Sequence, residues 1–110
     1  MRPRLCLSLL IGTLGIAQAD SMPIVMMSGK AITPRAPSIT FTIQNPGRAA
    51  AKTHVLTMTG QEVAELSALS LNRFVWDGKD VDQQDVDPGF YVVQIQQNGS
   101  FWHGPVIVKR

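Results

Sequence analysis

The chain has 110 residues and a formal net charge of +2 at pH 7, which limits it to one domain and excludes a strongly basic nucleic-acid-binding protein. Its single cysteine excludes a framework of internal disulfides. A domain of this size must therefore rely on a compact apolar core.

The first 19 residues have the form of a secretory signal peptide. Arg2 and Arg4 give a basic start, an apolar run extends from Leu5 to Ile16, and a small–x–small cleavage segment ends at Ala19. The apolar run is too short to span a bilayer comfortably. We therefore expect cleavage before Asp20 and export of the mature chain to the periplasm, the outer surface or the medium.

Removal of this leader, residues 1–19, changes the charge and cysteine counts. Cys6, Arg2 and Arg4 leave with it, so the ten basic residues become eight and balance the eight acidic ones. The mature chain then has no disulfide and no predicted transmembrane segment. Nothing in its charge indicates binding to nucleic acid or to an anionic membrane.

Residues 20–37 are predicted to form an irregular lead-in or a short edge strand. Prolines interrupt this segment, whereas Ile24 to Met27 is apolar enough for an edge strand. Clear strand patterns begin at residue 38. In Ser38–Gln44, alternation places Ile39, Phe41 and Ile43 on one face, which predicts a strand with a buried side.

The middle of the chain predicts two further strands and a connector. One strand is expected over about residues 51–58, followed by a turn at Thr59-Gly60 and a segment anchored by Val63 and Leu66. The connector over Ser67–Asn72 is predicted to cap one end of the core with its leucines.

The stretch from Arg73 to Tyr91 organises the second half. Arg73–Trp76 has strand composition, Asp77-Gly78 predicts a tight turn, and an acidic connector follows up to Pro88. A long strand then starts no earlier than Gly89 because proline cannot donate to a ladder. Its alternation predicts a core-facing set: Tyr91, Val93 and Ile95.

The last two strands are predicted to form a hairpin. Asn98-Gly99 is a strong signal for a two-residue hairpin turn, and residues 101–108 return as the final strand. Gly104-Pro105 within it predicts a bulge or an edge position. Six or seven short strands without an amphipathic helix indicate an all-β fold, a small antiparallel sandwich of immunoglobulin or fibronectin-III type.

A spaced set of motifs extends across residues 38–110. A glycine-centred turn has a valine three residues on, a Trp-Asp-Gly segment follows, and Gly-x-Tyr opens the long strand. The motif residues are Asn45, Pro46, Gly60, Val63, Trp76, Asp77, Gly78, Gly89 and Tyr91. In this spacing the segment resembles the immunoglobulin-like domain of the flagellar hook-capping protein FlgD. It is also similar to the C-terminal sorting domains of the type IX secretion system.

The resemblance implies a β-sandwich that presents surfaces and does not catalyse a reaction. Its expected partners are proteins of the cell envelope or of the secretion machinery. The implied roles are envelope assembly, surface display or secretion sorting. Pairing at an open sheet edge is the expected mode of contact.

The acidic connector suggests a second hypothesis, a calcium- or carbohydrate-binding accessory module. Calcium binds through several oxygen ligands, and the candidate ligands are Asp77, Asp80, Asp82 and Asp85. Their spacing does not match the EF-hand loop, so the alternative is a solvated loop in which Asp77 caps its own turn. No other cofactor is indicated.

The remaining candidates give weaker signals. His54 and His103 lack the short spacing of metal ligands and are expected on strand surfaces or edges. No serine lies in a nucleophile motif, so the chain is not expected to be an enzyme. Trp102 follows Phe101, and one of these adjacent rings must point outward. An outward Trp102 would contact a protein or a sugar, and an inward one would cover an open end of the sandwich.

Overall fold

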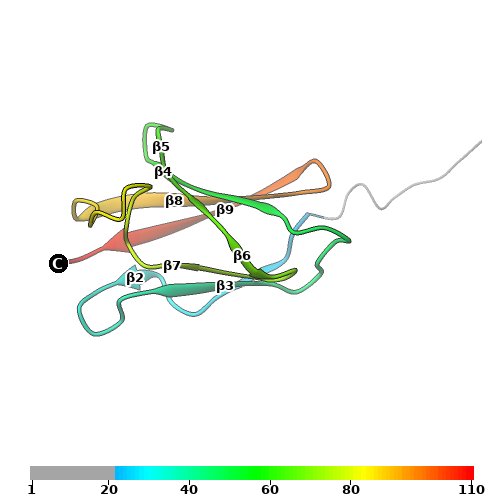
Figure 1. The fold of residues 1–110 in the computed structure, drawn as a ribbon, viewed down its shortest axis with the longest axis horizontal. Coiled ribbons are helices and arrows are strands. Elements are labelled where there is room, and N and C mark those ends of the chain that lie inside the picture. The colour runs from blue at the N-terminus through cyan, green and yellow to red at the C-terminus, as the bar shows by residue number, and fades with distance from the viewer. Residues whose placement is uncertain (1–21) are drawn as a thin grey trace, which may run out of the picture.

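The computed structural model describes residues 22–110, which form nine β-strands in two layers (Figure 1). The predicted signal peptide lies outside the described residues. The described part of the chain contains no helix, and hence no helix long and apolar enough to cross a membrane.

One layer is a four-stranded antiparallel sheet with the order β1-β3-β7-β6. The other is a five-stranded sheet with the order β2-β9-β8-β4-β5, in which β2 runs parallel to β9. The strands are β1 (Val25–Met27), β2 (Ala31–Ile32), β3 (Ile39–Ile43), β4 (Lys52–Thr57), β5 (Glu62–Leu66), β6 (Ala68–Ser70), β7 (Arg73–Trp76), β8 (Gly89–Gln97) and β9 (Ser100–Val108).

The alternating patterns of β3 and β8 supply facing halves of the core, as predicted. The inward residues of both strands are buried: Ile39, Phe41, Ile43, Tyr91, Val93 and Ile95. Each such apolar side chain contributes about 1.5–3 kcal/mol through removal from water. Phe90, on the opposite face of β8, is 63% exposed, as the two-residue period of a strand requires.

Trp76 of β7 and Tyr91 of β8 connect the two layers. Their ring centroids lie 5.5 Å apart in an edge-to-face arrangement. Trp76 Nε1 donates a hydrogen bond to the Lys79 carbonyl at 2.9 Å, and the Tyr91 hydroxyl donates to the Asp87 carbonyl at 2.6 Å. Burial, together with the Asp87 charge, raises the pKa of Tyr91 above its usual 10.0, so the hydroxyl keeps the proton that it donates.

The Tyr91 hydrogen bond to a backbone group four residues upstream is the tyrosine corner of immunoglobulin-like domains. The strand order agrees, because such domains pair strands A, B, E and D in one sheet and C, F and G in the other. Here β1-β3-β7-β6 and β4-β8-β9 correspond to these sheets. Antibody domains place a disulfide cysteine two residues after this tyrosine, where Val93 is buried in this chain. The predicted immunoglobulin-like sandwich is confirmed, with apolar packing at the position of the disulfide.

The lead-in contributes strands to both sheets. β1 confirms the predicted edge strand by pairing with β3. β2 was not predicted, because a two-residue strand among prolines leaves no periodic signal. It adds to the outer side of β9 through pairs at Ile107 and Val108.

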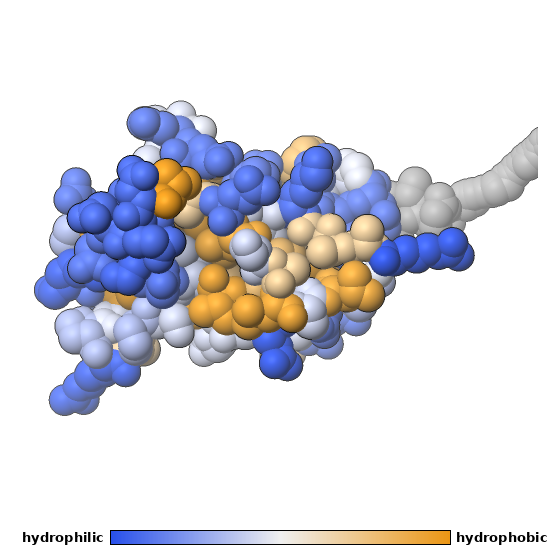
Figure 2. Space-filling model, in the orientation of Figure 1, coloured by the Kyte–Doolittle hydropathy of each residue, from blue (hydrophilic) through white to orange (hydrophobic). Residues whose placement is uncertain are grey.

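The connector after β5 differs from its prediction. β6 forms within it and all three β6 residues are exposed, so its leucines do not cap the core: Leu69 is 66% and Leu71 48% exposed. Figure 1 shows that the chain crosses here from the five-stranded sheet to the four-stranded one along the side of the sandwich. The leucines of the connector therefore lie outside the space between the sheets. Apolar residues are visible in the middle of that side, between polar ends (Figure 2).

The predicted bulge at Gly104-Pro105 is also wrong. The register between β8 and β9 is continuous from Ser100 to Val108. The edge alternative is correct, since β2 covers β9 only at its last two residues. Pro105 has no backbone N–H to donate, and it lies in the part of β9 where no strand pairs on that side, so no ladder hydrogen bond is lost.

We expect Tyr91→Phe to lower the free energy of unfolding by about 1–2 kcal/mol, because it removes the hydrogen bond to the Asp87 carbonyl without changing the packed ring. Urea unfolding measures the effect. Phe90→Leu, a change to the exposed neighbour, is the control and should stay within about 0.5 kcal/mol of the parent protein. An unchanged midpoint for Tyr91→Phe would contradict the role of the corner.

Candidate functional site on the outer face of the five-stranded sheet

The outer face of the five-stranded sheet is apolar where β8 begins. The register pairs Phe90 with Ile107, and Val92 with both Pro105 and Leu56. These five residues are therefore cross-strand neighbours on one surface. We call this surface, which is one half of the outer face of the five-stranded sheet, the apolar half. Phe90 and Pro105 are exposed and the others are half-buried. Antiparallel sheets with one solvated face usually carry polar residues there, so this surface is a candidate contact site.

The next row across the same face is polar. His103 of β9, Gln94 of β8, His54 of β4 and Glu65 of β5 stand opposite one another in register. His103 Nε2 lies 3.1 Å from Gln94 Oε1. The two histidines are on strand surfaces, as predicted, but the strand that carries Gln94 separates them. They do not form a shared pair of metal ligands.

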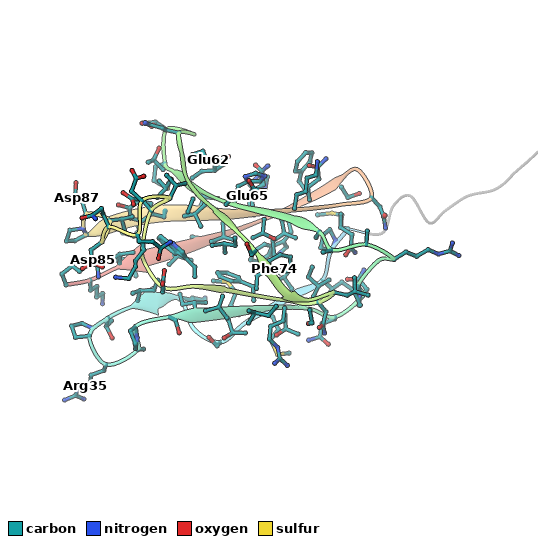
Figure 3. All side chains as sticks on the ribbon, viewed as in Figure 1. Arg35, Glu62, Glu65, Phe74, Asp85 and Asp87 are labelled. Atoms are coloured by element: carbon teal, nitrogen blue, oxygen red, sulfur yellow. The ribbon has the colours of Figure 1, made fainter. Side chains whose placement is uncertain are left out.

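A β-bulge places a second carboxylate beside His54. The register between β4 and β5 shifts between Val55 and Leu56, which leaves Val63 as an extra residue in β5. In a regular strand, two residues three positions apart point to opposite faces. The bulge instead puts Glu62 and Glu65 on the same face, as Figure 3 shows. Within residues 22–110, these carboxylates join one imidazole in a group whose ligand atoms lie within 4.8 Å of one another: His54, Glu62 and Glu65.

The four aspartates predicted as calcium ligands form no such group within the described part of the chain. Asp80 Oδ1 accepts hydrogen bonds from the backbone N–H groups of Asp82 and Gln84 at 2.9 and 3.0 Å. Asp77 Oδ1 accepts one from the backbone N–H two residues on, at 3.3 Å. Both side chains therefore cap their own turns, which agrees with the alternative of a solvated loop.

Asp85 closes the acidic connector through ion pairs. Its Oδ1 lies 2.9 Å from Lys79 Nζ and 3.8 Å from Arg110 Nη1. Arg110 Nη2 also donates to the carbonyls of Gly78 and Val86 at 3.0 and 3.1 Å. The hydrogen bond and charge of Lys79, assisted by Arg110, hold the pKa of Asp85 below its usual 3.8. The same contact raises the pKa of Lys79 above 10.5.

The motif residues of the sequence build turns, the bulge and the ends of the connector. Asn45 Oδ1 accepts from the Ile24 N–H at 2.7 Å, and its amide donates to the Met22 carbonyl at 3.0 Å, which fixes the lead-in. Pro46 follows on the surface. Gly60 lies in the β4–β5 turn and Val63 in the bulge. The remaining motif residues lie at the two ends of the acidic connector: Trp76, Asp77, Gly78, Gly89 and Tyr91.

Trp102 points inward and Phe101 outward. Trp102 is half-buried against the core and contacts the Phe41 ring edge-on, with centroids 6.3 Å apart. Its six-membered ring covers Gly104, where an added Cβ would lie 2.1 Å from Cη2. Phe101 is 43% exposed and stacks on His103. The outward aromatic is thus Phe101, and Trp102 has the covering position.

No family model matches the chain, and no curated protein sequence matches it significantly. The solved structures that are similar to it include two that match 80% of the chain. One is the Ig1 domain of mouse SynCAM 2, with a TM-score of 0.46, 8% identity and 93% of that chain covered. The other is the alkylpurine DNA glycosylase AlkC of Pseudomonas fluorescens bound to DNA containing an abasic-site analogue, with a TM-score of 0.40, 17% identity and 30% of that chain covered. Similarities of this size define neither a family nor a function. The strand order and the tyrosine corner define the class, an immunoglobulin-like β-sandwich module.

We expect Gly104→Ala to destabilise the protein by about 1–3 kcal/mol, because the new methyl group displaces the Trp102 ring. In a strand without such a contact, the same change would stabilise by about 0.5–1 kcal/mol. The test is a double-mutant cycle with Trp102→Ala, measured by urea unfolding. In the Trp102→Ala background the cost of Gly104→Ala should vanish, and an equal cost in both backgrounds would contradict the contact.

Asp85→Asn should lower the melting temperature near neutral pH and leave it unchanged in strong acid. Because the folded-state pKa of Asp85 lies below 3.8, its stabilisation is present above about pH 4 and is lost as the pH falls through the lowered value. The effect is small, since the pair is exposed, and it shrinks in 1 M salt. Asp82→Asn, whose carboxylate has no ion pair within residues 22–110, is the matched control. A difference independent of pH would refute this assignment.

Proposed function

We propose that this chain is an exported, non-enzymatic immunoglobulin-like module that binds a protein of the cell envelope or secretion machinery through the apolar half. The observation that carries the proposal is the contiguous apolar surface on β4, β8 and β9, with Phe90 63% exposed at one end. Interface centres are rich in aromatic residues and poor in charge, and this surface carries an exposed aromatic ring and no charged side chain.

Three sheet edges support contact through the face better than pairing at an edge, and the fourth, the part of β9 that β2 leaves uncovered, is interrupted by Pro105, which has no backbone N–H to donate. β1 and β6, the edges of one sheet, have three residues each. β5, an edge of the other, has a bulge and carries Glu62 and Glu65. Short, bulged and charged edges are the features by which sheets avoid pairing with other chains.

Export and an envelope role rest on the sequence. The basic start, apolar run and small–x–small segment of residues 1–19 support passage across a membrane. The spacing of the Trp-Asp-Gly and Gly-x-Tyr motifs supports a role like that of hook-capping or type IX sorting domains, which act by presenting surfaces.

Photo-crosslinking in the native host tests the contact. A benzophenone amino acid at position 90 should give one major adduct, with an envelope protein identified by mass spectrometry. The same probe at Leu69, which is exposed on the β6 side, is the matched control and should give none. Adducts from position 69 and none from position 90 would overturn the assigned surface.

With the partner identified, we expect Phe90→Ser to weaken its binding by about 2 kcal/mol, or roughly thirtyfold, because a large exposed aromatic that becomes buried on binding acts as a hot spot. Leu69→Ser should leave the affinity unchanged. Titration calorimetry measures both.

N-terminal sequencing of the exported protein should begin at Asp20, and an unprocessed chain would refute export.

A further inference from the structure

We propose that His54, Glu62 and Glu65 form a binding site for one divalent zinc-type cation on the outer face of β4 and β5. This inference is independent of the proposed protein contact, because it concerns the isolated chain. The three side chains provide one imidazole nitrogen and two carboxylates, all with ligand atoms within 4.8 Å of one another.

The spacing suits a tetrahedral ion after small side-chain rotations. Zinc binds imidazole nitrogen and carboxylate oxygen at about 2.0–2.2 Å, which separates neighbouring ligand atoms by roughly 3.4 Å. His54 Nδ1 and Glu62 Oε1 already lie 2.9 Å apart. Glu62 has a half-exposed side chain and Glu65 is exposed, so water can take the remaining coordination position.

The environment of His54 Nδ1 is the second observation that points to a ligand. This atom has no solvent exposure and no hydrogen-bond partner within the described residues. Glu62 Oε1 is near enough to pair with it but lies outside hydrogen-bonding geometry. A polar atom that loses water without gaining a hydrogen bond destabilises the folded protein. A cation between Nδ1 and the carboxylates removes that cost by accepting the nitrogen lone pair.

The backbone holds the three ligands on rigid elements. His54 lies on β4, which is paired on both sides, with Glu65 opposite it on β5. The bulge at Val63 turns Glu62 onto the same face. Bulges often occur next to functional sites, where they redirect a side chain. Two ligands three residues apart on one strand face therefore require this particular departure from regular pairing.

The ligand chemistry favours zinc over calcium and magnesium. Imidazole nitrogen suits zinc, copper and nickel, whereas calcium and magnesium prefer sites made of oxygen atoms. The Asp77–Asp87 connector is a different place in the fold and holds its carboxylates in turns and ion pairs.

Titration calorimetry of the purified protein with zinc chloride, in a buffer that does not bind metal, tests the site. We expect one ion per chain and a rise in melting temperature of about 5 °C or more at saturation. His54→Gln and Glu65→Gln should each weaken binding at least tenfold. Glu65 is exposed and His54 is half-buried on the outer face of the sheet, so far-UV circular dichroism should show folded variants.

Two matched controls separate this site from its neighbours. His103→Gln removes the other histidine of the same face, and Asp80→Asn alters the acidic connector; both should leave zinc affinity unchanged. No binding by the parent protein would overturn the proposal. So would zinc binding that survives His54→Gln, binding that is lost on His103→Gln, or calcium binding of equal strength at the same residues.

Discussion

The contact between Trp76 and Tyr91 is the constraint on which the rest of the structure depends. It joins the two sheets, and the polar atoms of both rings hold the ends of the acidic connector through the Lys79 and Asp87 carbonyls. By fixing Tyr91 inward it also decides the faces of β8, because a shift of one residue would exchange them. The outward position of Phe90, and with it the apolar half, follows from this corner.

Features that depend on local alternation could be predicted from the sequence. The inward residues of β3 and β8 follow a two-residue period, and both sets are buried. Asn98 and Gly99 have positive φ angles of 53° and 79°, as the predicted hairpin turn requires. The turn after Trp76 and the surface positions of both histidines could likewise be read from composition and spacing.

Features that depend on pairing between strands could not be predicted. The bulge at Val63 has no sequence signal. In a regular strand Glu62 and Glu65 would point to opposite faces, so the sequence does not predict that both lie beside His54. Outward apolar residues were visible in β8, but their continuity with Leu56 and Pro105 depends on the register. The acidic connector contains several aspartates that could supply oxygen ligands to a cation. Turn capping and ion pairing, which the sequence does not show, determine where those oxygens point.

The parallel pairing of β2 with β9 gives the sandwich a definite response to mechanical force. If the two ends of the domain are pulled apart, β2 and β9 are drawn in opposite directions along their common axis. The bonds from the Ile107 N–H to the Lys30 carbonyl and from the Lys109 N–H to the Ile32 carbonyl are then strained together and not one after another. Rupture requires their simultaneous loss. A short strand between prolines therefore places these two bonds in shear whenever a pulling force reaches β2.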